Sequence, residues 1–189
     1  SAVKMIKDKE VVRDVRKNIH KLILLQDDKG KFNDDGYKDL FRMTKLFNQR
    51  SMYVKRKHAL NNLALFLRDN NMLPAIAFVF SRKMVELCAS EITVPILEDD
   101  SKIPYTVRKE CEQIIRKLPN FKEYLELPEY NNLVSLLEKG VGIHHSGMIP
   151  ILREIVEIMI SKKNIKLLFA TESFAIGLDC PIKTAVFTG

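Results

Sequence analysis

Residues 140–170, GVGIHHSGMIPILREIVEIMISKKNIKLLFA, contain the pattern that decides the fold. The apolar run at residues 140–145 predicts a strand, and Pro150 then occupies the first turn of a predicted helix, where its missing N–H costs nothing. This helix is amphipathic, and its apolar face is made of Ile151, Leu152, Ile155, Val156, Met159 and Ile160. A second apolar run at residues 165–170 predicts another strand. Strand, helix and strand in this order predict a parallel sheet covered by helices.

The same alternation extends to both sides of this stretch. Residues 75–80, AIAFVF, form a continuous apolar run, which is typical of a strand that is buried on both faces. Ser81 then stands where a helix cap is expected, before a helix predicted over residues 82–90. Residues 184–187 begin a fourth strand. We therefore predict an α/β fold.

The first third of the chain has a weaker pattern. Residues 21–26 predict a short strand, and Gly30 supplies the backbone freedom that the following turn needs. Helices are predicted over residues 34–48 and 51–70 because apolar residues recur there at spacings of three and four. We expect residues 1–70 to form a strand and helical lead-in to the main domain.

The main domain is predicted to span residues 71–189, with a helical insertion at about residues 91–138. The insertion has no clear strand pattern, and it contains predicted helices near residues 104–118 and 129–138. A chain of 189 residues suits one ordinary domain with a sizeable insertion.

Positive charge gathers in the first third of the chain. The net charge is +7, and residues 1–60 contain 16 Lys and Arg against 8 Asp and Glu. A cluster in this region is a candidate for steering toward phosphate backbones: Arg50, Lys55, Arg56 and Lys57. The alternative is a solvated helix face, since a run of charges is weak evidence by itself.

Cysteine usage and hydropathy narrow the class of protein. Cys88, Cys111 and Cys180 are widely spaced and odd in number, so the sequence predicts neither disulfides nor a zinc site. No uncharged stretch approaches the roughly 20 apolar residues of a membrane span. We expect an intracellular protein, cytoplasmic or nuclear. The opening Ser1-Ala2 suggests a piece of a longer chain.

Chemistry is expected in the loops at the carboxyl ends of the strands, as is usual in parallel sheets. These loops are residues 81–83, 144–148 and 171–179, and each offers small or hydroxyl residues with backbone amides, which suit phosphate. His144 and His145 are adjacent at a strand end, so their side chains point to opposite faces and cannot chelate one metal together.

Three segments resemble helicase motifs four, four-a and five, and they occur in that order. These are residues 78–83 (FVFSRK), 140–150 (GVGIHHSGMIP) and 169–181 (FATESFAIGLDCP). Residues 140–188 are most similar to the superkiller and exosome-cofactor group of superfamily-two DExH-box RNA helicases. The resemblance implies the second RecA-like domain of such a helicase, a P-loop NTPase-type helicase C-terminal domain.

The resemblance also implies roles for single residues. Motif five would place Gly177 and Asp179 at the nucleotide, although this group more often has Asn where Asp179 stands. The alternatives are a helix cap for Ser81, a turn for Gly177 and a solvated carboxylate for Asp179. The residues that would contact nucleic acid are Ser81, Arg82, His145, Ser146, Gly147, Thr171 and Glu172.

The resemblance implies ATP and Mg²⁺ for the full-length protein, but the sequence assigns no catalytic residue. Gly30-Lys31 is followed by Phe32 and lacks the upstream Gly of a Walker A loop, and no Asp-Glu dipeptide occurs. The arginine-rich motif six is expected beyond residue 189. We therefore expect these 189 residues alone to be inactive as an ATPase.

The implied partners are RNA, as a single strand or a duplex end, and the first RecA-like domain of the same protein. Two other functions stay open on the sequence. One is a non-catalytic module that kept the fold to bind RNA or a protein, and the other is a DNA-directed superfamily-two helicase of the repair type, which shares the His-His loop.

Overall fold

The structure is a computed structural model that describes residues 23, 25–27, 29–49, 55–98, 100–171 and 182–188. Within it the chain divides into two compact units, Ser1–Lys55 and Arg56–Gly189. Each unit is described by itself.

The first unit contains a tight turn followed by helix α2 (Asp34–Gln49). Gly30 has φ of +80°, and its N–H donates to the Asp27 carbonyl at 3.0 Å. The Asn33 carboxamide oxygen accepts from the Gly36 N–H at 3.1 Å, which satisfies an amide of the first helical turn. The turn and the helix agree with the sequence prediction. Of the strand predicted at residues 21–26, the described part contains an isolated bridge between Gln26 and Phe32.

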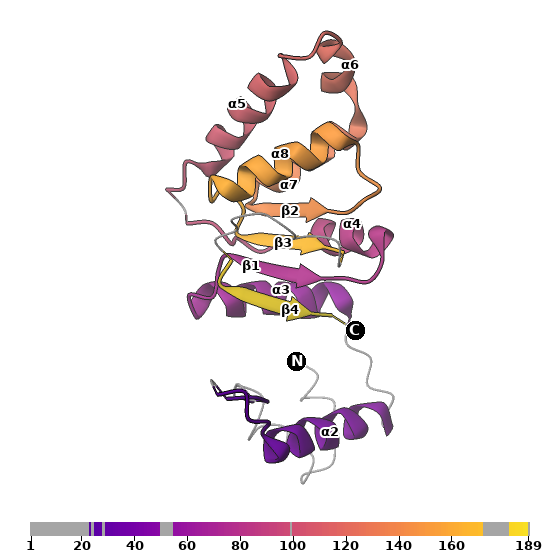
Figure 1. Cartoon of the computed structure of the whole chain (residues 1–189), viewed down its shortest axis with the longest axis vertical. Helices are drawn as coiled ribbons and strands as arrows, with labels where there is room; N and C mark the ends of the chain where they lie inside the picture. The colour runs from indigo at the N-terminus through magenta and orange to yellow at the C-terminus, as the bar shows by residue number, and fades with distance from the viewer. Residues whose placement is uncertain are drawn as a thin grey trace. The chain divides into compact units, whose positions relative to one another are not determined.

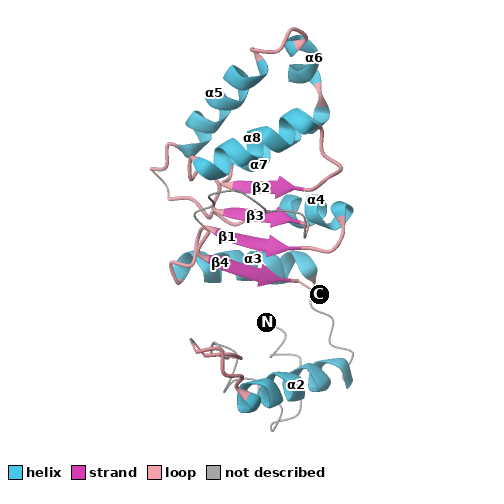
Figure 2. Ribbon diagram, in the orientation of Figure 1, coloured by secondary structure: helices cyan, strands magenta, loops and turns pink. Residues whose placement is uncertain are grey.

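The second unit is built on a four-stranded sheet (Figures 1 and 2). Its strands are β1 (Ala75–Phe78), β2 (Val141–His144), β3 (Leu167–Ala170) and β4 (Thr184–Phe187). They lie in the order β2-β3-β1-β4, and every pair is parallel. The predicted α/β fold with a parallel sheet is confirmed.

Helices cover both faces of this sheet (Figure 1). Helix α4 (Arg82–Ser90) packs on β2 and β3, beside α7 (Pro128–Glu138) and α3 (Arg56–Asp69). Helix α8 (Pro150–Ser161) covers the other face of β2. The predicted apolar side of α8 is confirmed, because Leu152, Ile155, Val156, Met159 and Ile160 are buried.

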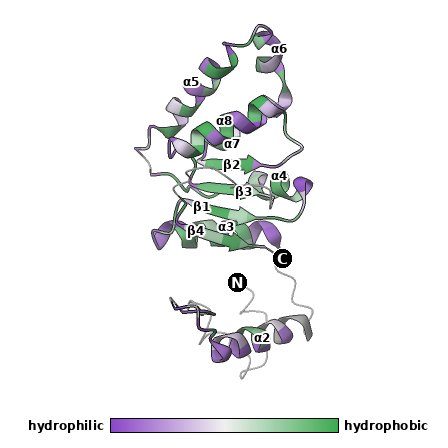
Figure 3. Ribbon diagram, viewed as in Figure 1, coloured by the Kyte–Doolittle hydropathy of each residue, from purple (hydrophilic) through white to green (hydrophobic). Residues whose placement is uncertain are grey.

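The core lies between the sheet and these helices. All residues of β2 and β3 are buried, as expected for strands covered on both faces. Figure 3 shows the corresponding hydrophobic colouring along the strands and mixed colouring along α8. Helix α3 contributes Leu60, Ala64 and Leu67 to the same core, so it packs with the second unit although it precedes the expected boundary at residue 70.

The insertion is helical, as predicted, and packs at the β2 edge of the sheet. It contains α5 (Ile103–Ile115), α6 (Phe121–Glu126) and α7. Helix α5 packs on α7 and α8. The sequence did not predict α6, because six residues are too few to show a helical period. Burial raises the pKa of the Cys111 thiol on α5 to about 12.

One buried side chain holds α3 to the segment that follows α4. The Asn61 carboxamide donates to the carbonyls of Lys57 and Glu91, both at 2.7 Å. Its oxygen accepts from the backbone amides of Thr93 at 2.8 Å and Val94 at 3.0 Å. Asn61 thus fixes the chain as it leaves α4 and approaches the insertion.

One residue of the predicted basic cluster, Arg56, forms an ion pair within the second unit. The Arg56 guanidinium pairs with the Glu91 carboxylate through Nε at 2.8 Å and its second terminal nitrogen at 2.9 Å. This hydrogen-bonded pairing lowers the pKa of the Glu91 carboxyl. Lys55 and Lys57 are exposed, and Arg50 lies outside the described residues.

The described helices include none that is long and apolar enough to cross a membrane. Cys88 and Cys111 are both buried free thiols, while Cys180 lies outside the described residues.

Candidate nucleic-acid interface

Three loops meet at the carboxyl-terminal edge of the sheet, as expected for parallel strands. Beyond β1, the Val79 N–H donates to the Ala170 carbonyl at 2.8 Å, so the loop that contains Ser81 runs beside the end of β3. The Thr171 N–H donates to the His144 carbonyl at 3.2 Å, which places Thr171 beside the end of β2. The first residue after β3 therefore lies between the other two loops.

His145 organises the loop that follows β2. Its side chain is buried, with 4% of its surface exposed, and its Nδ1 accepts from the Gly147 N–H at 3.1 Å. A neutral imidazole that accepts at Nδ1 must carry its proton at Nε2. That nitrogen lies 3.1 Å from the Glu86 carboxylate of α4, to which it can donate. His145 thus links the loop to the helix covering this face.

His144 faces the opposite side of the sheet. Its Nε2 lies 3.0 Å from the Glu157 carboxylate of α8. The two histidines therefore hydrogen-bond to carboxylates on different helices, in agreement with the predicted opposite orientation. The described residues contain no group of three or more side chains that could hold a metal ion.

Arg82 extends along the loop that contains Gly147. A methyl group placed on Gly147 would lie 3.2 Å from the Arg82 Cδ atom, so the glycine permits this close approach. Arg82 and Lys83 are exposed, and Arg82 forms no ion pair with any residue that the structure describes. The loop after β1 thus places the exposed positive charge of Arg82 beside Gly147 of the loop after β2.

Ser81 occupies the N-cap position of α4, as predicted, with φ of −138° and ψ of 133°. Its hydroxyl makes no capping hydrogen bond, whereas its carbonyl accepts from the Val85 N–H at 2.9 Å. The hydroxyl at the start of this helix is therefore not used to satisfy the first-turn amides, which favour an anion.

The remaining residues expected at the site are Glu172, Gly177 and Asp179. All three lie outside the described residues, so their roles stay predictions.

Sequence reasoning did not identify Glu86 and Glu157 as partners of the histidines. The opposite orientation of His144 and His145 indicates that each needs a polar partner on the helix covering its face. Helix α4 carries one carboxylate, Glu86, whereas α8 carries two, Glu154 and Glu157, and only the packed structure shows that Glu157 is the partner of His144.

The chain is similar to helicases over most of its length, although no protein-family model matches it. It is 32% identical to an uncharacterised helicase of Schizosaccharomyces pombe over 88% of the chain and 16% of that relative. It is 40% identical to the antiviral helicase SKI2 of Saccharomyces cerevisiae over 65% of the chain and 9% of that relative. It is 29% identical to the human exosome RNA helicase MTR4 over 88% of the chain and 16% of that relative.

The chain therefore spans less than a fifth of the length of these relatives. The parallel α/β sheet is the fold expected of a RecA-like helicase domain. The chain belongs to the superfamily-two DExH-box helicases of the superkiller and exosome group.

Proposed function

We propose that this chain is the second RecA-like domain of an ATP-dependent RNA helicase and forms one wall of its ATP and RNA cleft. The observation that carries the proposal is the meeting of three loops, after β1, β2 and β3, at one edge of the sheet. The names of the relatives, which include an antiviral helicase and an exosome RNA helicase, support a motor that acts on RNA.

The proposed RNA contacts are directed at the phosphate backbone. Exposed Arg82 supplies charge, while the hydroxyls of Ser81 and Thr171 supply hydrogen-bond donors. Contacts of this kind read no base sequence, which suits a motor that translocates along a strand. Glu172 is assigned to the same surface from the motif alone.

The loop after β2 has a more limited role than its motif suggests. The Gly147 N–H already donates to His145, and the Met148 N–H donates to the His145 carbonyl at 3.2 Å. We therefore propose that Ser146 makes the phosphate contact of this loop. Gly147 leaves room for the Arg82 side chain, and His145 fixes the loop through its hydrogen bond with the Gly147 N–H.

The nucleotide contacts are assigned to Gly177 and Asp179 in the segment after Thr171. ATP and Mg²⁺ belong to this proposal as cofactors of the whole protein. Their phosphate-binding loop and magnesium ligands are absent from the 189 residues, so we expect the purified chain to show no RNA-stimulated ATP hydrolysis. Measurable RNA-stimulated ATPase activity in this chain would contradict that assignment.

RNA binding by the purified chain tests the interface. Fluorescence anisotropy with single-stranded RNA at several salt concentrations gives the affinity and its salt dependence. Replacing Arg82 with Ala should weaken binding and lower the salt slope by roughly 0.7 per lost phosphate contact. Thr171→Val should weaken binding at an unchanged slope, because it removes no charge.

Lys122→Ala is the matched control, since Lys122 is exposed on α6, in the insertion. Its affinity for RNA should equal that of the unaltered chain. If Arg82→Ala and Lys122→Ala bind alike, the interface is wrongly placed. A matched DNA strand that binds more tightly than RNA would favour the DNA-directed helicase.

A further inference from the structure

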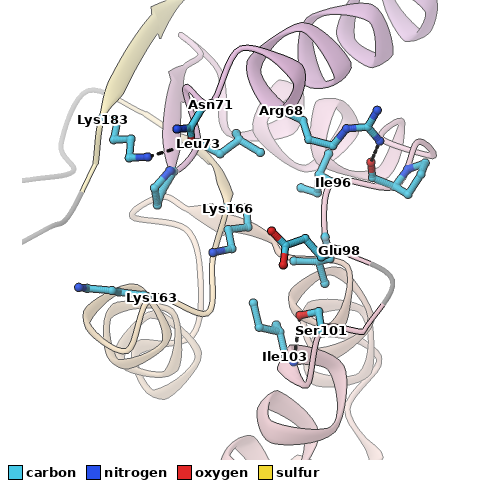
Figure 4. A pocket seen from close by; sticks show the side chains of 13 residues that line it. Arg68, Asn71, Leu73, Ile96, Glu98, Ser101, Ile103, Lys163, Lys166 and Lys183 are labelled. Carbon is cyan, nitrogen blue, oxygen red and sulfur yellow. Dashed lines mark hydrogen bonds between the residues drawn. The ribbon is translucent and has the colours of Figure 1, made fainter.

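A pocket of about 750 Å³ opens at the amino-terminal edge of the sheet, at the opposite ends of the strands from the three loops (Figure 4). Pro74 precedes β1, Lys166 precedes β3 and Lys183 precedes β4. The far wall comes from the segment after α4 and the start of α5, through Pro95, Ile96, Leu97, Glu98, Ser101 and Ile103. None of the described residues of the proposed RNA site lines this pocket.

Positive charge predominates around the opening. The lining contains four cationic side chains and one described carboxylate, that of Glu98. Arg68 is paired with Asp69 at 2.8 Å. Lys183 donates to the Asn71 carboxamide at 3.3 Å. Lys163 and Lys166 form no ion pair with any residue in the described ranges, so their ammonium charges remain available to a ligand.

Lys163 stands at a backbone position where glycine is the usual residue. Its φ is +61°, and it follows Lys162, the C-cap residue of α8, in a Schellman arrangement. The Lys163 N–H donates to the Ile160 carbonyl at 2.8 Å, and the next N–H donates to the Met159 carbonyl at 2.9 Å. A left-handed conformation disfavours any residue with a side chain. The residue in this strained conformation, Lys163, also contributes a positive charge to the rim of the pocket.

Part of the pocket lining is apolar, and we call this part the floor. It consists of the side chains of Leu73, Pro74, Pro95, Ile96, Leu97 and Ile103, and the described lining residues include no aromatic ring. Proteins that bind single strands usually stack bases on aromatic rings. An apolar floor beneath separated ammonium groups instead suits a large aliphatic side chain with carboxylates on either side.

We infer that this pocket binds an acidic segment of a partner protein, which buries one aliphatic side chain between carboxylates. The carboxylates pair with Lys163, Lys166 and Lys183 while the aliphatic side chain contacts the floor. Such a partner engages the domain at the edge opposite the three loops, so it can remain bound while those loops hold RNA. The inference stands independently of the proposed RNA contacts.

A fluorescent peptide with one leucine between two runs of aspartate tests the inference by anisotropy with the purified chain. It should bind saturably, and replacing either the leucine with serine or the aspartates with asparagines should weaken it. Lys166→Glu and Lys183→Glu should each reduce the affinity about fivefold. Lys122→Glu makes the same charge change outside the pocket and should leave the affinity unaltered.

Lys163→Gly separates lost binding from lost folding. This variant removes a rim charge and relieves the strained backbone, so it should bind the peptide more weakly while its Tm rises. Peptide binding that is equal in all the lysine variants would overturn the inference. Single-stranded RNA or inorganic polyphosphate that binds more tightly than the peptide, with the same sensitivity to Lys166→Glu, would overturn it in favour of a phosphate site.

Discussion

The two edges of the parallel sheet are constructed differently. At the carboxyl-terminal edge, each loop contributes neighbouring residues, such as Ser81 with Arg82 and Ser146 with Gly147. At the amino-terminal edge, the pocket takes Lys163 and Lys166 from the short segment between α8 and β3, and Lys183 from the residue before β4. The first edge uses neighbouring residues within each loop, whereas the second edge adds a lysine from a distant segment and a wall from the residues that follow α4.

The difference also concerns what holds each surface in place. The loop after β2 depends on one hydrogen-bonded histidine whose partner, Glu86, is 61% exposed. The pocket wall depends on the fully hydrogen-bonded Asn61 and on the close approach of Gly140 to Leu97. We therefore expect substitutions behind the amino-terminal edge to alter stability, and substitutions at the carboxyl-terminal edge to alter binding.

The largest expected effect is that of Asn61→Ala. The change removes the side-chain partner of two backbone amides and two carbonyls, so the free energy of unfolding should fall by about 3 kcal/mol. Urea denaturation followed by far-ultraviolet circular dichroism measures it. Asn62→Ala, at the exposed neighbouring position, should stay within about 0.5 kcal/mol of the unaltered chain. Equal losses in both variants would show that the hydrogen bonds of Asn61 do not stabilise the pocket wall.

Gly140→Ala should lower the free energy of unfolding by about 2 kcal/mol. Gly140 has φ of +76°, and an added methyl group would lie 2.7 Å from the Leu97 Cδ2 atom. The same denaturation measurement applies. When Leu97 is already Ala, adding Gly140→Ala should lower the free energy of unfolding by less than it does in the unaltered chain. The clash is then removed, and only the backbone strain remains. If Gly140→Ala is as stable as the unaltered chain, the Leu97 side chain can move aside at little cost in free energy.

Lys163→Gly should raise the free energy of unfolding by about 0.5 to 1 kcal/mol, since glycine accepts the left-handed conformation without steric cost. Lys163→Ala is the control, because it removes the same charge and keeps the strain. The glycine variant should be the more stable of the two in thermal denaturation. If the two variants are equally stable, the backbone at this position is not strained.

Glu86→Ala should weaken RNA binding about threefold and leave the unfolding midpoint almost unchanged, because it releases His145 and lets the loop after β2 lose its fixed conformation. Glu86→Gln keeps an oxygen that accepts the same hydrogen bond, and it should bind RNA as the unaltered chain does. A loss that is equally large for glutamine would indicate that the charge of Glu86 matters and the hydrogen bond does not.

The smallest effect is a pH dependence at the start of α3. Arg56 lowers the pKa of the Glu91 carboxyl in the folded state, so this pair stabilises the fold above the ordinary Glu pKa of about 4.3 and less as the pH falls through the lowered value. Arg56→Gln should therefore be less stable than the unaltered chain at neutral pH, by a margin that narrows in acid. Denaturation at both pH values measures the margin, and a constant margin would exclude Glu91 as the partner that matters.

The sequence predicted most of the architecture because its signals are local. The apolar runs before Ser81 and before Thr171 gave strands, and the apolar face of residues 151–160 gave the helix that covers them. Adjacency of His144 and His145 was enough to predict their opposite orientation. The strand order was not predicted, because the pattern of a single strand contains no information about its neighbours.

By itself, then, the sequence determined most of the elements, the parallel sheet and the loops at its carboxyl-terminal edge. Only the tertiary structure decided which carboxylate meets which histidine. Glu86 and His145 are 59 positions apart. They become partners because β2 pairs with β3 and α4 packs on both strands. The lysine pocket has the same origin, since Lys183 joins Lys163 and Lys166 from a different segment, and the wall comes from residues that follow α4. Periodicity reports the face of one element, whereas a site made of single residues depends on how all the elements pack.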